Sequence, residues 1–388
     1  MIRRPTESRS SQDLAASASW GKREDMVVHG TDPYNAEPAP HALASGHLTP
    51  VDMFYTRNHG PVPDLDPETW RLRVDGLVAT PLELTRKALQ EDFEQRTVTA
   101  TLQCAGNRRA DLNLVRRVPG EDLWGPGATS TATWTGAALA EVLRAAGLQG
   151  DARHACFSAP DLTGLAHPPQ TYGSSVEIHK ALSDEVLLAW QMNGQALPAV
   201  HGAPGRVVVP GYIGARSVKW LDRVTGSLHP SDSYFQETAY RLLPADGTPG
   251  PGIGMSLGPV ALSSAILVPA DGTTVPVGRT DVQGYAYAGD RGIARVDVSL
   301  DDGATWIEAA LDDQAGPWTW RRWRIPLPLQ EGKARISARA WDTAGATQPR
   351  SAGEVWNPKG YLNISWARAT VIVVPAKERS PSGPSELP

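Results

Sequence analysis

The sequence predicts an α+β domain followed by a β-sandwich near the size of an immunoglobulin-like domain. Up to about residue 243, alternating strand patterns are mixed with one clear helix pattern and long irregular loops. Residues 244–260 are rich in Gly and Pro, as linkers between domains are. Beyond them, short alternating segments separated by Gly and Asp turns are typical of a sandwich. We therefore place the two domains at residues 31–250 and 251–375, between a flexible N-terminal segment (1–30) and a disordered C-terminal tail (376–388).

In the first domain, one stretch has the spacing of a helix and four have the pattern of strands. Leu139, Val142, Leu143 and Ala146 recur at helical spacing, and Gly147 ends the pattern. This predicts that TWTGAALAEVLRAAGL, residues 133–148, forms a helix. The expected strands are residues 70–78, 97–103, 185–194 and 205–214.

The second domain has three clear strand patterns. ARVDVSLDDGATW, from Ala294 to Trp306, alternates apolar and polar residues and then turns at Asp302 and Gly303. The alternation returns in KARISARAWD and in ATVIVVP near the C-terminus. Repeated short strands of this kind predict a sandwich that buries one face of each sheet.

Composition excludes several classes of protein. The chain of 388 residues has 37 basic and 42 acidic residues, so its net charge of -5 predicts no general attraction to nucleic acid or to an anionic membrane. Its two cysteines, Cys104 and Cys156, argue against a disulfide framework and a multi-cysteine zinc site. Cys156 stands in an apolar stretch and is expected in the core.

The ends of the sequence predict a cytoplasmic location. Arg3 and Arg4 are not followed by the apolar region that a secretory or twin-arginine signal requires. No window is apolar enough to span a bilayer, and the final residues are not a peroxisomal signal. We therefore expect a cytoplasmic protein that does not bind membranes.

The most informative stretch is TVTATLQCAGNRR, residues 97–109. Its first half alternates as a strand, and the alternation stops at Cys104, where a turn leads to Arg108 and Arg109. Nearby positive charge favours the thiolate, which ligates metals and attacks electrophiles. The alternative is a small, inert, buried thiol beside solvated arginines.

Further basic and polar residues stand in Gly- and Pro-rich loops at the ends of predicted strands. Each alone is more often a surface or structural residue, but together they predict an anion pocket within one domain. Arginine binds oxyanions with two parallel hydrogen bonds, and backbone amides of residues 214–217 could form a phosphate nest. The residues concerned are Arg57, Asn58, His59, Arg108, Arg109, His201, Arg206, Arg216, Ser217 and Lys219.

Several segments resemble the sulfite oxidase family. They are TRNHGPVP, LQCAGNRR, WTGAALAEVL and MNGQALPAVHGAPGRVVVPGYIGARSVKWL in the first domain, and VSLDDGATW and WNPKGYLNISWARATVIV in the second. They stand in the family's order and cover most of residues 50–375. The resemblance implies an α+β molybdopterin-binding domain, which holds a molybdenum cofactor, followed by an immunoglobulin-like domain used for homodimerisation.

The resemblance also implies roles for individual residues. Cys104 would be the one protein ligand to molybdenum, beside the two dithiolene sulfurs of a molybdopterin. The implied cofactor-binding residues are Arg57, Asn58, His59, Cys104, Asp161, His201, Arg206, Arg216, Ser217 and Lys219. The implied catalytic residues, around a small oxyanion, are Arg57, Cys104, Arg109, Tyr240 and Lys359.

Three positions depart from the family pattern. Lys359 in WNPKG stands where the family has an arginine, which keeps the charge but loses bidentate geometry and should weaken oxyanion binding. Pro119 stands where a basic residue is common. Phe235 replaces the tryptophan expected shortly before Tyr240.

We therefore expect a sulfite oxidase or sulfite dehydrogenase, which oxidises sulfite to sulfate by oxygen-atom transfer. We see no segment for a haem or flavin domain, so electrons are expected to pass to oxygen or to an external acceptor such as cytochrome c. The alternative is a reductase of the same superfamily that acts on nitrate or an S-oxide. A third possibility, an inactive molybdopterin-binding protein, is disfavoured because Arg57, Cys104, Arg109 and Tyr240 are all present.

Overall fold

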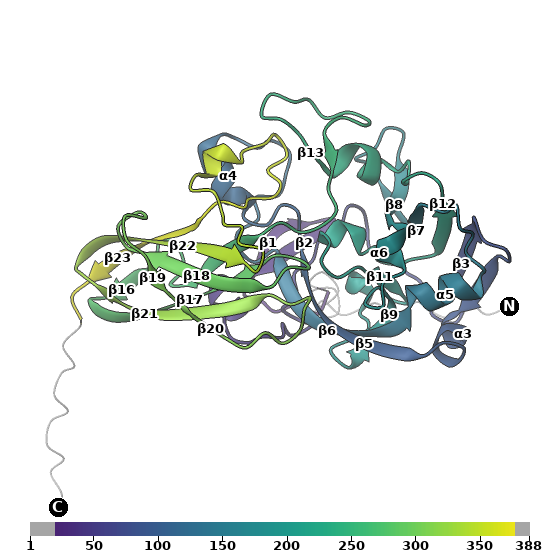
Figure 1. The fold of residues 1–388 in the computed structure, drawn as a ribbon, viewed down its shortest axis with the longest axis horizontal. Helices are drawn as coiled ribbons and strands as arrows, with labels where there is room; N and C mark the ends of the chain where they lie inside the picture. Colours follow the sequence, from purple (N-terminus) through teal and green to yellow (C-terminus); the bar gives the residue numbers. More distant parts are fainter. Residues whose placement is uncertain (1–19, 377–388) are drawn as a thin grey trace, which may run out of the picture.

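The computed structural model describes residues 20–376, which form two sheet-rich domains lying side by side (Figure 1). The first domain, drawn in purple to teal, contains most of the helices, and the second, drawn in green to yellow, is built from two sheets. This is the predicted order of an α+β domain and a β-sandwich; the exact domain limits stay a prediction. Among the described residues, no helix is long and apolar enough to cross a membrane.

One sheet of the first domain ends at the loop that carries Cys104. Its antiparallel strands follow the order β10–β9–β6–β5, and β11 pairs with β9. Alternation along β5 buries Ala100 and Leu102 on the side of Cys104, whereas the Thr101 hydroxyl accepts a hydrogen bond from the Trp320 amide of the second domain (2.8 Å). The strands are β5 (Gln95–Gln103), β6 (Thr129–Ala138), β9 (Leu187–Met192), β10 (Gln195–Ala196) and β11 (Arg206–Val208).

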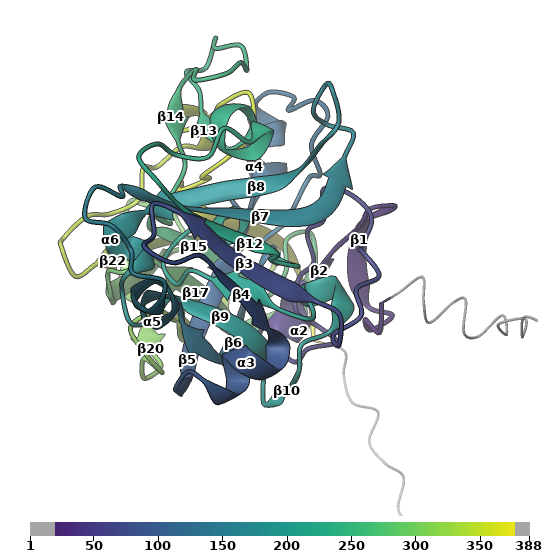
Figure 2. The same ribbon diagram turned by 90° about the vertical axis from the view of Figure 1, so that its right-hand side faces the viewer.

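The other large sheet of the first domain lies over the first one (Figure 2). Its order is β4–β3–β12–β7–β8, and only β12 and β3 run parallel. Leu72 and Phe157 of this sheet and Leu188 of the other belong to one buried core, in which each such side chain contributes about 1.5–3 kcal/mol. The strands are β3 (Arg71–Gly76), β4 (Leu82–Thr85), β7 (His154–Thr163), β8 (Gln170–Glu177) and β12 (Arg223–Ser227).

Short helices fill the connections between these strands. Thr85 begins one of them, because its hydroxyl accepts a hydrogen bond from the Ala88 amide (2.9 Å). The α-helices are α2 (Pro40–Leu43), α3 (Arg86–Glu91), α4 (Arg109–Val115), α5 (Leu139–Ala145) and α6 (Ile178–Ala181). The tighter or wider single turns are η1 (Ala199–His201), η2 (Gly214–Arg216) and η3 (Phe235–Ala239), and in the second domain η4 (Ala352–Glu354).

The second domain is a sandwich of two sheets, in the orders β15–β17–β21–β20 and β16–β23–β22–β18–β19. Inward-facing residues such as Val282, Val298 and Ile336 fill the space between them. The strands are β15 (Ser263–Val268), β16 (Thr274–Pro276), β17 (Gly278–Tyr287), β18 (Ile293–Ser299), β19 (Ile307–Glu308), β20 (Ala310–Leu311), β21 (Arg321–Leu329), β22 (Gly332–Asp342) and β23 (Ala367–Val374).

The N-terminal segment is more structured than the sequence predicts. Within the predicted flexible residues 1–30, Met26 begins strand β1 (Met26–Thr31), which pairs with β2 (Tyr34–Pro38). Lys22 is buried, and its ammonium group donates to the carbonyl oxygens of Val51 (2.6 Å) and Phe54 (2.9 Å). The prediction is therefore wrong for this part, since buried hydrogen bonds fix it; residues 1–19 and 377–388 lie outside the described residues.

The predicted helix at residues 133–148 is wrong in its first half. Thr133 to Ala138 belong to strand β6, which is central in its sheet between β5 and β9, and α5 begins only at Leu139. The helical spacing of the apolar residues starts at Leu139, and Gly147 ends the helix with a φ of 69°. Before Leu139, pairing with the neighbouring strands β5 and β9 determines the conformation, and the local spacing of apolar residues does not reveal this pairing.

Two further details differ from expectation. The Gly- and Pro-rich linker is not wholly irregular, because it contains β14 (Met255–Ser256), which pairs with β13 (Arg241–Leu242) just before the linker. Cys156 is only half-buried, on β7, and its thiol lies 3.6 Å from the His229 carbonyl oxygen.

Candidate active site

Cys104 is held at the end of β5 by backbone hydrogen bonds on both sides. Its amide donates to the Ala128 carbonyl oxygen (2.8 Å), and its carbonyl oxygen accepts from the Asn107 amide (3.0 Å). The Gly106 amide points at the Cys104 sulfur (3.4 Å). The thiol therefore has a fixed position in a tight turn.

The charge state of the Cys104 thiol differs from the simplest expectation. Burial raises its pKa above the ordinary value, although the charge of Arg109, the Gly106 amide and the charge of Arg57 act in the opposite direction. The two arginines alone would lower the pKa of the Cys104 thiol, but burial has the larger effect and the pKa is raised. A thiol in this setting becomes a thiolate when a cation coordinates it.

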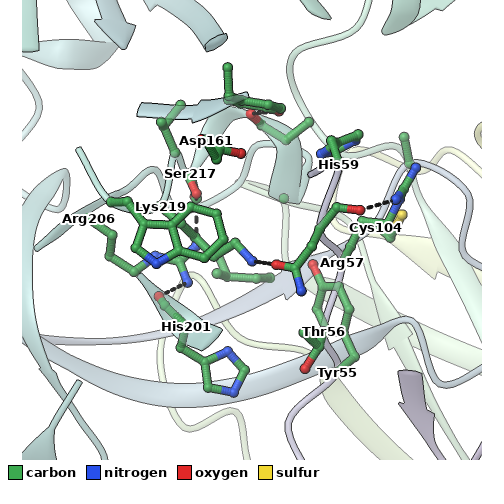
Figure 3. A pocket seen from close by; sticks show the side chains of 18 of the residues that line it. Tyr55, Thr56, Arg57, His59, Cys104, Asp161, His201, Arg206, Ser217 and Lys219 are labelled. Carbon is green, nitrogen blue, oxygen red and sulfur yellow. Dashed lines mark hydrogen bonds between the residues drawn. The ribbon is translucent and has the colours of Figure 1, made fainter. Parts of the chain in front are cut away.

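A pocket opens beside Cys104 in the first domain and encloses about 660 Å³, including its open mouth (Figure 3). Ten of the predicted site residues line it, drawn from loops and strands that are far apart in the sequence. These residues are Arg57, Asn58, His59, Cys104, Asp161, His201, Arg206, Ser217, Lys219 and Tyr240. The structure thus brings together most of the anion pocket that the sequence predicts.

The loop that carries Arg57, Asn58 and His59 is fixed by the N-terminal hairpin. The Asn35 side chain accepts from the Asn58 amide (2.6 Å), and the Asn58 side-chain amide donates to the Tyr34 carbonyl oxygen (2.7 Å). The Lys219 ammonium group donates to the Asn58 side-chain oxygen, which joins this loop to the far wall of the pocket. The hairpin therefore positions the site.

His59 and Tyr240 form a hydrogen-bonded pair, with 2.6 Å between Nε2 and the hydroxyl oxygen. Tyr172 and Phe235 pack against the His59 ring, at centroid distances of 5.1 Å and 4.6 Å. Burial, followed by the charges of Arg57 and Lys219, holds the pKa of His59 well below its ordinary value, and burial raises that of Tyr240. Both groups are therefore neutral near pH 7. Phe235, which stands where the family pattern has a tryptophan, is one of the two rings packed on His59.

The opposite wall of the pocket carries Arg206, Lys219 and Asp161. Arg206 donates to the carbonyl oxygens of His201 (2.9 Å) and Ser217 (2.8 Å); burial lowers its pKa to about 10, so it stays charged at neutral pH. Burial raises the pKa of Asp161 to about 7, although the charge of Lys219 opposes this. Burial likewise holds the pKa of Lys219 well below its ordinary value.

Arg216 is a predicted cofactor-binding residue that does not line the pocket. Its guanidinium group is fully buried and donates to the Leu257 carbonyl oxygen (2.8 Å), the Ser174 hydroxyl (2.8 Å) and the Gln236 side chain. The side chain ties the turn η2 to β8, η3 and the linker. The backbone of this turn still reaches the pocket through Gly214, Ala215 and Ser217.

Arg109 and Lys359, both predicted catalytic residues, also lie outside the pocket lining and next to each other. Arg109 is buried, and its Nε donates to the Lys359 carbonyl oxygen (3.0 Å). A Cβ atom on Gly106 or on Gly360 would meet the Arg109 side chain at 2.5 or 2.6 Å, so both glycines are needed for this packing. Both cations contact Glu121. Arg109 Nη2 lies 3.5 Å from Glu121 Oε2, and Lys359 Nζ contacts Glu121 Oε1.

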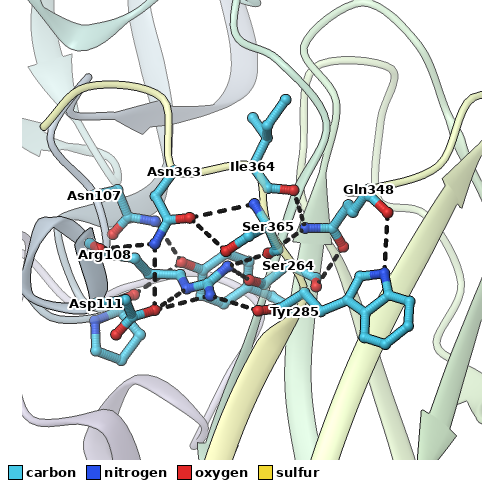
Figure 4. Close-up of polar contacts among 11 residues, drawn as sticks. Asn107, Arg108, Asp111, Ser264, Tyr285, Gln348, Asn363, Ile364 and Ser365 are labelled. Atoms are coloured by element: carbon cyan, nitrogen blue, oxygen red, sulfur yellow. Dashed lines mark hydrogen bonds and ion pairs between the residues drawn. The ribbon is translucent and has the colours of Figure 1, made fainter. Parts of the chain in front are cut away.

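Arg108 clamps the Cys104 loop to the second domain (Figure 4). Its guanidinium group donates to the carbonyl oxygens of Ser264 (2.8 Å), Ser365 (2.9 Å) and Trp366 (2.9 Å). Its own carbonyl oxygen accepts from the Asn363 side chain (2.9 Å). The sequence groups Arg108 with the anion-binding arginines, but the structure assigns its donors to the backbone of the second domain.

Several pocket or supporting residues were missed by the sequence analysis. Lys22 contacts His201 at 2.5 Å between Nζ and Nε2, and no local pattern marks it. Glu121 and Asp122 were missed because acidic residues do not fit the expectation of an anion site. Tyr55, Thr56, Tyr172 and Trp220 also line the pocket; the sequence analysis singled out neighbours of Tyr55, Thr56 and Trp220 but none of Tyr172.

Comparison with known proteins identifies the family. Residues 59–235 match the model of the oxidoreductase molybdopterin binding domain, and residues 257–374 match that of the Mo-co oxidoreductase dimerisation domain. Mitochondrial sulfite oxidase of Rattus norvegicus is 41% identical over 95% of this chain and 70% of its own length. Sulfite oxidase of Arabidopsis thaliana is 37% identical over 89% of this chain and 94% of its own. The chain belongs to the sulfite oxidase family.

The family includes relatives with other names. Nitrate reductase [NAD(P)H] of Hordeum vulgare is 37% identical over 93% of this chain, but the chain spans only 44% of that protein. Among solved structures, sulfane dehydrogenase SoxCD from Paracoccus pantotrophus has a TM-score of 0.76 at 26% identity, covering 94% of this chain and 92% of that one. These matches confirm the predicted molybdopterin-binding domain followed by a dimerisation domain.

The residues of the pocket fit a molybdopterin. Cys104 offers one thiol as a metal ligand, and Arg57, Arg206 and Lys219 offer donors for an anionic group. In addition, Asp161 Oδ1 and Arg206 Nε are buried without a hydrogen-bond partner. Buried polar atoms are seldom left without partners, and the ring nitrogens and oxygens of a pterin could satisfy them. The individual cofactor contacts stay predictions.

Proposed function

We propose that this chain is a molybdopterin-dependent enzyme that oxidises sulfite to sulfate by oxygen-atom transfer. The observation that carries the proposal is the convergence of the Cys104 thiol, the Arg57 guanidinium group and the His59–Tyr240 pair on one pocket, in a chain of the sulfite oxidase family. The relatives named sulfite oxidase share about two fifths of their residues with it over nearly the whole chain.

The side chains divide the work by position. Arg57, in the pocket lining, and Arg109, which lies outside the lining but whose charge acts on the Cys104 thiol, bind and orient a small oxyanion, since guanidinium groups match its geometry. The neutral Tyr240 hydroxyl, oriented by His59, offers a hydrogen bond at the same place. The bound molybdenum cofactor supplies the two-electron oxidation-reduction chemistry. Burial of these groups strengthens their electrostatic interactions with the substrate.

The alternative is reduction of nitrate or an S-oxide in the same pocket. It is favoured by the similarity to a nitrate reductase and by the acidic Glu121 and Asp122, which reduce the positive charge available to a dianion. Sulfite oxidation is ranked first because the sulfite oxidases match over a larger share of their own length.

Three accompanying proposals concern the assembly of the enzyme, its electron acceptor and its location. The match of residues 257–374 to a dimerisation domain supports a homodimer. Electrons pass to oxygen or to a separate acceptor such as cytochrome c, without haem or flavin in this chain. The cytoplasmic location stays a prediction, which fractionation of cells expressing the full chain would test.

The test is sulfite-dependent reduction of ferricyanide by protein that contains about one molybdenum per chain, the ratio expected for a single thiolate ligand. The metal assay comes first, because inactivity of unloaded protein has no meaning. Rapid reduction supports sulfite oxidation. Loaded protein that ignores sulfite but oxidises a reduced viologen with nitrate or an S-oxide establishes the alternative.

A further inference from the structure

Glu121 forms ion pairs with Arg109 and Lys359, two cations that the sequence predicts to bind the substrate oxyanion. Its Oε2 lies 3.5 Å from Arg109 Nη2, and its Oε1 contacts the Lys359 ammonium group from the second domain. The side chain is 11% exposed, so these contacts are shielded from solvent. The one carboxylate thus spans two of the cations that were predicted to face the substrate.

The neighbouring Asp122 completes the pattern. Its carboxylate lies 3.8 Å from Arg57 Nη1, and its carbonyl oxygen accepts from Arg109 Nη1 (2.8 Å). The three cations predicted to face the substrate, Arg57, Arg109 and Lys359, are therefore paired with two carboxylates, which leaves one net positive charge among these five side chains. A dianion meets much less attraction here than three unpaired cations would provide.

The loop that carries Glu121 is anchored, so the carboxylate stays near the site. The Arg108 amide donates to the Gly125 carbonyl oxygen (2.8 Å), and the Glu37 side chain accepts from the Gly125 amide (2.6 Å) and the Gly127 amide (2.9 Å). The Asn35 side chain donates to the Asp122 carboxylate (3.2 Å). The backbone that carries Glu121 and Asp122 is therefore held next to the Cys104 loop.

We propose that Glu121 is a specificity-determining residue of the substrate site. Its carboxylate competes with the oxyanion for Arg109 and Lys359, lowers the affinity for dianions more than for monoanions, and favours release of a dianionic product. This inference rests on the proposed function, in which sulfite enters the site and sulfate leaves it.

The test compares the wild type with Glu121→Gln, which keeps the shape and removes the charge. Isothermal titration of molybdenum-loaded enzyme with sulfate gives the affinity without turnover, so this arm remains valid if sulfite oxidation fails. We expect Glu121→Gln to bind sulfate about tenfold more tightly, a change of about 1.4 kcal/mol, and to bind nitrate with a smaller gain. In the activity assay, the sulfite KM falls and inhibition by sulfate becomes stronger.

The control is Glu331→Gln, which removes the same charge from an exposed position in the second domain and should leave sulfate affinity unchanged. Unchanged or weaker sulfate binding in folded Glu121→Gln would overturn the proposal and assign Glu121 a structural role between the domains. If that variant does not fold, Glu121→Asp withdraws the carboxylate by one methylene. Sulfate affinity above the wild type in Glu121→Asp then supports the proposal, and equal or lower affinity rejects it.

Discussion

The Cys104 thiol lies under two opposing influences, since burial raises its pKa and the charges of Arg109 and Arg57 lower it. Coordination of a metal cation favours loss of the thiol proton, because only the thiolate is a metal ligand. We expect Cys104→Ser to lose sulfite-dependent ferricyanide reduction and most of its bound molybdenum, since a serine hydroxyl does not ionise in a buried site. Turnover and metal content are measured on the same preparation. Appreciable sulfite oxidation by the variant would contradict the ligand assignment.

Arg57 is predicted to contact both the substrate and the cofactor, and a substitution can distinguish these two roles. It lines the pocket and remains cationic: burial acts to lower its pKa, but the nearby Asp122 carboxylate helps to hold the pKa above the ordinary value. We expect Arg57→Gln to raise the sulfite KM about tenfold or more, because a charged hydrogen bond contributes about 1.5–3 kcal/mol, while the molybdenum content changes little. Arg279→Gln, at an exposed arginine of the second domain, is the matched control. A wild-type KM would restrict Arg57 to cofactor contacts.

Asp161 provides a prediction about stability and pH. Its pKa is about 7 in the folded chain and 3.8 as a reference for the unfolded chain. Between these pH values the folded state binds more protons, so this group makes the free energy of unfolding fall as the pH rises from about 4 to about 7. We expect cofactor-free Asp161→Asn to exceed the wild type in stability by a margin that grows from pH 5 to pH 8, reaching about 1–3 kcal/mol. Urea unfolding at each pH measures the margin; a constant margin would show that Asp161 does not titrate there.

At the scale of elements, the β1–β2 hairpin supports the substrate loops from outside. Asn35 accepts from the Asn58 amide (2.6 Å) and donates to the Asp122 carboxylate (3.2 Å), and so joins two loops that meet at the pocket. We expect Asn35→Ala to cost about 1–3 kcal/mol of unfolding free energy, because it leaves the buried Asn58 amide without a partner. The sulfite KM should also rise, because Arg57 directly precedes Asn58 in this loop and loses its fixed position when the loop loses its anchor. Loss of stability with an unchanged KM would limit the hairpin to a structural role.

The sequence predicts these elements well where local pattern and tertiary environment agree. The alternation of residues 97–103 corresponds to β5, and the strands expected near residues 294, 333 and 369 correspond to β18, β22 and β23. Prediction failed at Thr133–Ala138, where pairing with two neighbouring strands overrode the local spacing, and in the N-terminal hairpin, whose stability comes from residues far along the chain.

The same distinction applies to the site. Loop motifs and the family resemblance together named ten residues that line the pocket, but also Arg109, Arg216 and Lys359, which do not. They did not predict where each side chain points: Arg216 faces a core of carbonyl and hydroxyl oxygens, and Arg108 faces the second domain. Glu121 could not be inferred from the sequence, because its effect depends on a contact with Lys359, more than two hundred residues away.

At the scale of the whole molecule, the second domain stabilises the loop that carries the metal ligand. Arg108, four residues after Cys104, donates to three carbonyl oxygens of the second domain, and the Asn107 side chain donates to the Tyr285 hydroxyl (2.7 Å). The geometry of the Cys104 turn therefore depends on a contact between the two domains. Folding of the domains and assembly of the site are coupled through this turn.

Replacement of Arg108 tests that coupling. We expect Arg108→Met to lower the free energy of unfolding by about 3 kcal/mol or more, because three buried carbonyl oxygens lose a charged donor. Calorimetry should then resolve two transitions, since the domains unfold separately when the clamp between them is lost. The variant should also retain less molybdenum than Arg279→Met, which removes an exposed arginine. A single transition at the wild-type temperature with full metal content would show that the Cys104 turn holds its shape without the second domain.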